Sequence, residues 1–185
     1  MKFAGISVPG QEVEKSEKLA YIFVMPDVVD ENSDVGRMAA YALGNLGNSS
    51  ETVINSLLAL LQDENSDVGR MAAYALGNLG NSSETVINSL LALLQDENSD
   101  VRWMAAYALG NLGNSSETVI NSLLALLQDE NSDVRWMAAY ALGKLGKKSN
   151  HILPTIIQWI QQHQESEYVG RVIDVLWYLV VGEEN

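Results

Sequence analysis

The chain repeats one pattern of apolar and polar positions along most of its length. Residues 100–113 read Asp-Val-Arg-Trp-Met-Ala-Ala-Tyr-Ala-Leu-Gly-Asn-Leu-Gly, and the same segment, with small changes, also begins at Asp34, Asp67 and Asp133. These starts lie about 33 residues apart, a period that indicates one supersecondary unit stacked several times. Any chemistry that requires a unique set of residues must therefore lie outside the repeats.

The apolar positions predict that each repeat begins with a helix. In the first repeat they follow the i, i+3, i+4, i+7 spacing of one helix face and comprise Val35, Met38, Ala39, Ala42, Leu43 and Leu46. We expect Ser33 to cap the start of this helix, and Gly47 to end it in the left-handed conformation. Ala40 and Gly44 lie on a flank of the helix, where small side chains would let neighbouring first helices approach closely.

A second helix is predicted to follow in each repeat, after the polar turn at residues 48–51. Its apolar stripe in the first repeat comprises Val53, Ile54, Leu57, Leu58, Leu60 and Leu61. The opposite side carries Thr52, Asn55, Ser56 and Ala59. This side is polar but uncharged and recurs unchanged, so it is interpreted as a passive outer surface.

Both ends of the chain depart from the repeat. Residues 1–29 carry a helix pattern that Pro26 ends, and they are interpreted as an N-terminal cap or half-repeat. Residues 30–165 form four repeats of about 33 residues, and residues 166–185 form a C-terminal half-repeat or cap helix. The prediction is a single all-α domain, an α-solenoid with a right-handed superhelix and the first helices on its inner face.

The repeats share the pattern Asp-x-x-x-Asp-Val-Arg-x-x-Ala-Ala-x-Ala-Leu-Gly-x-Leu-Gly, present at residues 96–113 and 129–146. This pattern resembles the short HEAT-like repeats associated with phycobilisome lyases, and it is similar to artificial α-helical repeat scaffolds. The resemblance implies the solenoid fold. It does not imply one function, because the class includes lyase subunits, adaptors and tails of signalling ATPases. Repeats one and two depart from the pattern, because Gly36 and Gly69 replace its arginine. We expect their first helices to be looser in the first turn.

Three positions of the first helix, spaced i, i+4 and i+8, lie opposite the apolar stripe. Across the repeats they hold Arg37, Arg70, Trp103, Trp136 and Arg171; then Tyr41, Tyr74, Tyr107 and Tyr140; then Asn45, Asn78, Asn111 and Lys144. The resemblance implies that these positions form a concave partner-binding surface, and Trp, Tyr and Arg are enriched in interface hot spots. In the alternative interpretation, the aromatic rings only cover neighbouring helices and expose a polar edge.

Composition narrows the classes of function. The formal net charge of −13 argues against nucleic acid and anionic membranes as partners, and it favours a partner with basic residues. The Asp-Glu-Asn-Ser-Asp loops resemble the start of a calcium loop, but Val35 and Tyr41 occupy the positions that need Gly and Glu. No metal site, cofactor or catalytic residue is predicted, and the chain has no cysteine.

The sequence therefore predicts a non-enzymatic scaffold that binds a protein or peptide. Two alternatives remain open: a phycobilin lyase-type subunit that handles a chromophore, and a repeat fragment of a larger signalling ATPase. Without a signal sequence or an apolar run of membrane length, a cytoplasmic location is expected. The near-identity of the repeats also allows a homodimer, through the C-terminal helix or by domain swapping.

Overall fold

The computed structural model describes residues 33–45, 47–148, 152–166 and 168–170, together with residues 173 and 177. Its helices run in the order α3 (Ser33–Asn45), α4 (Glu51–Leu60), α5 (Ser66–Leu79), α6 (Glu84–Leu93), α7 (Ser99–Leu112), α8 (Glu117–Ala125), the 3₁₀ turn η1 (Leu126–Gln128), α9 (Ser132–Lys148) and α10 (Ile152–Gln162). These ranges contain no strand, and the predicted all-α solenoid is confirmed. The predicted N-terminal cap and most of the C-terminal half-repeat lie outside the described residues.

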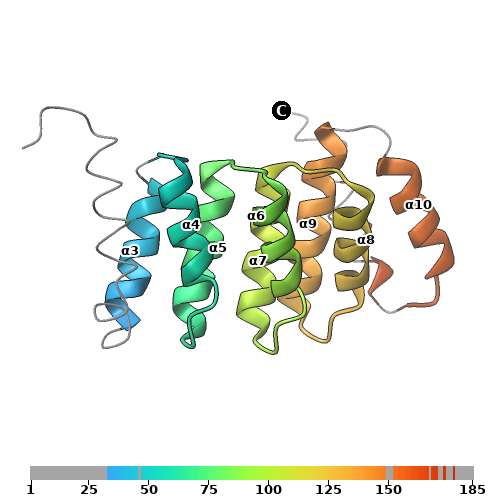
Figure 1. Cartoon of the computed structure of the whole chain (residues 1–185). Helices are drawn as coiled ribbons and strands as arrows, with labels where there is room; N and C mark the ends of the chain where they lie inside the picture. The colour runs from blue at the N-terminus through green and yellow to red at the C-terminus, as the bar shows by residue number, and fades with distance from the viewer. Residues whose placement is uncertain are drawn as a thin grey trace, which may run out of the picture.

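The helices form two layers (Figure 1). The first helices of the repeats, α3, α5, α7 and α9, pack side by side, each against the next. The second helices, α4, α6, α8 and α10, form the other layer, whose members contact one another much less. No described helix is both long enough and apolar enough to cross a membrane.

The core lies between the layers and consists of the predicted apolar stripes. Leu43, Leu76, Leu109 and Leu142 of the first helices are fully buried, and so are Val53, Val86 and Val119 of the second helices. Burial of each leucine contributes about 1.5–3 kcal/mol. The second helices of the first three repeats supply the same side chains and α10 supplies Ile152, Ile156 and Trp159, so the core is continuous along the stack.

A glycine in each of α3, α5 and α7 sets the distance to the next first helix. A Cβ atom built on Gly77 would lie 2.8 Å from the Cα atom of Ala108, and one built on Gly44 would lie equally close to Ala75. Real Cβ atoms do not come this near to backbone, so only glycine permits the contact. The predicted close approach of the first helices through Gly44 is confirmed.

Helix ends follow the predicted chemistry with one correction. Gly80 and Gly113 end α5 and α7 with φ values of 71° and 74°, and Gly47, just after α3, has a φ of 67°, the left-handed conformation predicted for it. In contrast, α9 continues through Gly146 to Lys148. The prediction that Ser33 caps α3 is wrong, because the helix already includes that residue. In α5 the cap is the preceding Asn65, whose side-chain oxygen accepts from the backbone N–H of Asp67 at 2.9 Å.

Two side chains lie elsewhere than predicted. Ser56 is buried at the margin of the apolar stripe, and its hydroxyl donates to the carbonyl of Thr52 at 2.8 Å, which satisfies it away from water. Met38 is 67% exposed, although it belongs to the predicted stripe. The equivalent Met104 and Met137 are buried, and their helices follow other first helices in the described stack, whereas α3 begins it.

The substitution Gly77→Ala should destabilise the chain. Its added methyl group would force α5 and α7 apart, and such overpacking lowers the free energy of unfolding by about 1–3 kcal/mol. Chemical denaturation followed by circular dichroism measures the loss. Gly170→Ala is the matched control, because nothing lies within 4 Å of its added Cβ atom, and it should gain up to about 1 kcal/mol of helix propensity. Equal stability of the two variants would contradict the role of the glycine contact.

Candidate partner-binding face

The candidate site residues lie on the layer of first helices. We call the described members of the predicted set the first-helix face: Arg37, Tyr41, Asn45, Arg70, Tyr74, Asn78, Trp103, Tyr107, Asn111, Trp136, Tyr140 and Lys144. None of them is fully buried, and Tyr41 and Trp136 are 52% and 50% exposed. Arg171, the remaining predicted member, lies outside the described residues. The face is therefore accessible along α3, α5, α7 and α9.

The tyrosines of successive repeats stack on one another. The ring centroids of Tyr41 and Tyr74 lie 6.4 Å apart at 13°, and those of Tyr74 and Tyr107 lie 6.0 Å apart at 12°. These separations are those of offset-stacked rings, which attract beyond their buried area. The rings meet across neighbouring helices because the glycine contacts hold those helices close.

Each tryptophan of the face stacks on a tyrosine of its own helix. The ring planes of Trp103 and Tyr107 are nearly parallel, at 1°, with centroids 6.0 Å apart, and those of Trp136 and Tyr140 lie at 15° with centroids 5.6 Å apart. The rings thus cover their neighbours, as the alternative interpretation requires, while they also stay partly open to solvent. Such fixed and accessible rings can serve as a platform for an incoming side chain.

At the third position of the face, the polar side chains also pair between repeats. Lys144 of α9 donates a hydrogen bond to the side-chain oxygen of Asn111 in α7. Both side chains are half-buried, whereas Asn45 and Asn78 are exposed. The hydrogen bond thus joins α7 to α9 at the third position of the face.

The first position of the face is charged in α3 and α5 but uncharged in α7 and α9. Arg37 lies 2.9 Å from the carboxylate of Asp34, and Arg70 lies 2.8 Å from that of Asp67, each pair within one helical turn. Trp103 and Trp136 replace these arginines in α7 and α9. The exposed carboxylates that precede the tryptophans therefore lack the arginine that their counterparts have.

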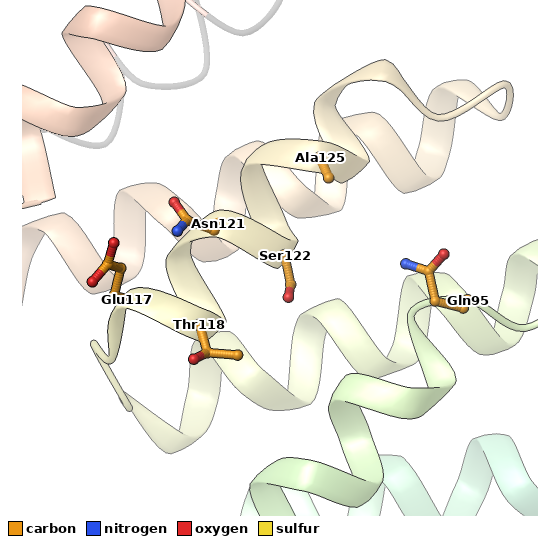
Figure 2. Close-up of a pocket in the computed structure, with 6 residues that line it drawn as sticks. All are labelled: Gln95, Glu117, Thr118, Asn121, Ser122 and Ala125. Atoms are coloured by element: carbon orange, nitrogen blue, oxygen red, sulfur yellow. The ribbon is translucent and has the colours of Figure 1, made fainter.

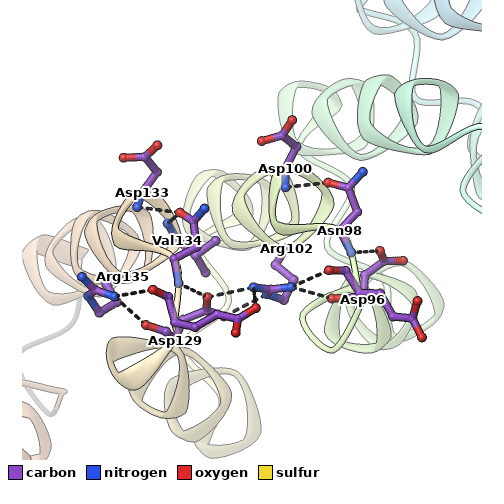
Figure 3. A network of polar contacts seen from close by, with 11 residues as sticks. Asp96, Asn98, Asp100, Arg102, Asp129, Asp133, Val134 and Arg135 are labelled. Atoms are coloured by element: carbon purple, nitrogen blue, oxygen red, sulfur yellow. Dashed lines mark hydrogen bonds and ion pairs between the residues drawn. The ribbon is translucent and has the colours of Figure 1, made fainter.

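A buried ion pair lies behind the second half of the face (Figure 3). Arg102 of α7 binds both carboxylate oxygens of Asp129, each at 2.8 Å, and its Nη1 donates to the carbonyls of Asp96 and Glu97. Both side chains of the pair are less than a tenth exposed. Because Asp129 lies between η1 and α9, the pair joins the third repeat to the fourth.

Arg135 occupies the equivalent place one repeat later. Its Nη1 donates to the carbonyls of Asp129 and Glu130 at 2.7 and 3.0 Å, and its guanidinium lies 4.0 Å from the ring centroid of Tyr168. Sequence reasoning treated this arginine only as part of the repeat pattern and missed its role. The sequence did contain a signal for such contacts: Arg102 and Arg135 recur one repeat apart, and an aspartate recurs in each loop between repeats.

The surroundings of the Arg102–Asp129 pair favour the charged form of both side chains. Burial raises the pKa of Asp129, but hydrogen bonds from Arg102 and the backbone N–H of Asn131, together with the charges of Arg102 and Arg135, outweigh this and lower it below 3.8. The hydrogen bond to Asp129 in turn raises the pKa of Arg102. The pair is therefore a permanent clamp at neutral pH.

The layer of second helices presents a different surface. A hollow of about 560 Å³ lies between the turn after α6, which supplies Gln95, and α8, which supplies Glu117, Thr118, Asn121, Ser122 and Ala125. Figure 2 shows these six residues. The lining of this hollow offers amides, hydroxyls and one carboxylate. A smaller hollow of about 270 Å³ separates α8 from α10. Within the described residues, no group of three His, Cys, Asp or Glu side chains could hold a metal ion.

Comparisons with known proteins agree with the repeat geometry. The sequence pattern of the family described as HEAT repeats matches residues 27–100 and 87–176, most of the chain. The chain belongs to the HEAT-repeat family. No curated protein matches its sequence.

Solved structures with a similar fold include engineered helical proteins. One engineered protein from the Northeast Structural Genomics Consortium is 22% identical, with 91% of this chain and 90% of that chain covered and a TM-score of 0.54. A second is 24% identical, with 92% and 93% covered and a TM-score of 0.55. A designed armadillo repeat protein, solved in complex with the peptide (KR)4, is 17% identical, with 90% of each chain covered and a TM-score of 0.54. At these identities the likeness concerns the fold alone.

Replacing Asp129 by Asn should destabilise the HEAT-repeat stack by about 3 kcal/mol at neutral pH, because it leaves the buried charge of Arg102 without its partner. In the wild type, the pKa of Asp129 is lower in the folded state. Its contribution is therefore present above the ordinary Asp pKa and is lost as the pH falls through the folded pKa. Denaturation measured at several pH values should show this loss in the wild type but not in Asp129→Asn.

The matched control is Asp67→Asn, which breaks the exposed pair with Arg70. It should cost less than about 1 kcal/mol, because exposed ion pairs contribute little. If the two variants lose equal stability, Arg102–Asp129 is not the clamp between the repeats.

Proposed function

We propose that this HEAT-repeat chain is a non-enzymatic scaffold that binds a segment of a protein or peptide on the first-helix face. The observation that carries the proposal is the continuous stack of Tyr41, Tyr74 and Tyr107, flanked by the tryptophans of α7 and α9. Tyr, Trp and Arg dominate the energetics of binding in protein interfaces. Rings fixed by stacking lose little conformational entropy when a partner binds, so more of the contact energy remains as affinity.

The packing of the layers supports placing this face on the inner side of a curved stack. First helices approach one another to glycine–alanine contact, whereas hollows open between α6 and α8 and between α8 and α10. A stack that is tighter on one layer bends toward that layer. The first-helix face is then the concave side, where an extended segment touches several repeats at once.

The repetition of the surface favours binding over catalysis. A catalytic site needs a unique set of residues, whereas the same Tyr and Asn positions recur along this face. The designed armadillo protein of similar fold was solved in complex with a basic peptide, which supports a peptide as the kind of partner. The net charge of −13 favours basic residues in that partner and faster encounter at low salt.

The variant Trp103→Ala/Tyr107→Ala/Trp136→Ala should lose binding. Peptides selected from a displayed random library against the wild type should bind the variant at least about tenfold more weakly, because the anchoring rings are gone. Fluorescence anisotropy of the labelled peptides measures the affinity, and circular dichroism verifies the helix content.

The control is Thr118→Ala/Asn121→Ala on the outer face of α8, next to the larger hollow. This variant should keep the affinity of the wild type. Peptides that depend on Thr118 and Asn121, and not on the aromatic residues, would move the binding surface to the second helices.

We also propose that two chains can form a homodimer through the C-terminal helix. Ile173 and Trp177 are 43% and 69% exposed, so two large apolar side chains are accessible to a second chain. We expect light scattering at rising concentration to give the mass of a dimer, and Trp177→Glu to give that of a monomer. A monomeric wild type at high concentration would contradict the dimer without affecting the proposal for the first-helix face.

A further inference from the structure

We propose that the second half of the first-helix face, on α7 and α9, binds the basic side chains of a peptide partner, and that the first half, on α3 and α5, does not. The proposal rests on the function proposed above and specifies the chemistry of the partner. It follows from a difference between repeats whose sequences are otherwise nearly the same.

In the first half of the face, an arginine of the same helix already pairs with the exposed aspartate. In α3 the guanidinium of Arg37 lies 2.9 Å from Asp34, and in α5 that of Arg70 lies 2.8 Å from Asp67. A lysine or arginine of a partner would have to displace these arginines to reach the carboxylates. It would also be repelled by them, because like charges at close range disfavour association.

The second half leaves the corresponding acids open. Asp100 and Asp133 are exposed, and within the described part of the chain neither makes an ion pair. Figure 3 shows both carboxylates pointing to the side away from Asp129. The arginines of these repeats do not reach them, because Arg102 is bound to Asp129 and Arg135 to the carbonyls of the same loop.

An aromatic pair lies next to each open carboxylate. Trp103 follows Asp100 by three residues and Tyr107 follows by seven, a spacing that places all three along one side of α7. The rings of Trp103 and Tyr107 stack with nearly parallel planes. A guanidinium within about 6 Å of such a ring is attracted by its negative face, and a carboxylate one helical turn away adds a charge-assisted hydrogen bond.

The fourth repeat offers the same arrangement with greater access. Trp136, half exposed, stacks on Tyr140 and follows the open Asp133. The positive charge on this face that would repel a basic side chain is that of Lys144. It lies eight residues beyond Trp136, roughly 12 Å along the axis of α9. The hydrogen bond to Asn111 keeps the ammonium group of Lys144 at the third position of the face. We therefore assign the site for basic side chains to the first turns of α7 and α9, away from Lys144.

The chain itself supplies the matched variant for a test. Trp103→Arg/Trp136→Arg gives repeats three and four the residue that repeats one and two carry, within reach of Asp100 and Asp133. Fluorescence anisotropy then measures three labelled peptides: alternating lysine and arginine, alternating glutamate and serine, and alternating glutamine and serine. The wild type should prefer the basic peptide, and the variant should bind it at least about tenfold more weakly.

Two further variants separate charge from shape. Asp100→Asn/Asp133→Asn keeps the rings and should weaken the basic peptide at least about fivefold, with a smaller dependence on salt. Arg70→Trp opens Asp67 and should tighten binding of the basic peptide about twofold or more. Circular dichroism and denaturation confirm that each variant is folded.

The outcomes separate this proposal from the scaffold function. If the neutral or the acidic peptide binds as tightly as the basic one, or if Trp103→Arg/Trp136→Arg keeps its affinity for the basic peptide, the charge assignment is wrong and the scaffold function stands. If the wild type binds none of the three peptides, the charge assignment is also wrong. The library selection against the aromatic variant then decides the scaffold function by itself.

Discussion

The contact between a glycine of one first helix and an alanine of the next is the constraint on which the rest of the stack depends. Gly44, Gly77 and Gly110 bring consecutive helices so close that a methyl group has no room between their backbones. The same closeness brings the tyrosines within stacking distance and leaves the second helices apart. In a repeat protein each unit contacts only its neighbours, so this one contact, applied repeatedly, sets the geometry of the whole stack.

The position of one arginine divides the chain into two halves. In repeats three and four it follows Asp-Val directly, where Arg102 turns toward the neighbouring loop and forms a buried clamp. In repeats one and two a glycine takes that place, and Arg70 comes one residue later. One residue rotates a helical side chain by about 100°, so the same arginine then reaches the surface and pairs with Asp67. Because Arg102 occupies the position that faces the loop, the surface position after it is taken by Trp103 instead of an arginine.

The HEAT-repeat fold accounts for the core, the caps and the two layers, but not for what the chain binds. Solved structures that are 17–24% identical share the fold, so the fold alone does not specify a partner. The positions that can confer specificity are those where repeats of the same chain differ. Here these are the first position of the face, the residue before it, and the third position, where Lys144 replaces the asparagine of the other repeats. The differences alter charge and aromatic content.

The sequence by itself determined the helices and their stacking. Period, apolar spacing and the glycine positions are local properties, and they predicted the buried leucines, the left-handed caps and the close first helices. It placed the first-helix cap one residue late, because Asn and Ser are both good caps and only the backbone distinguishes Asn65 from Ser66. The tertiary structure alone decided the Arg102–Asp129 clamp and the stacking of the tyrosine rings. Both join residues from different repeats, and their pairing depends on the distance and rotation between helices, which no local pattern contains.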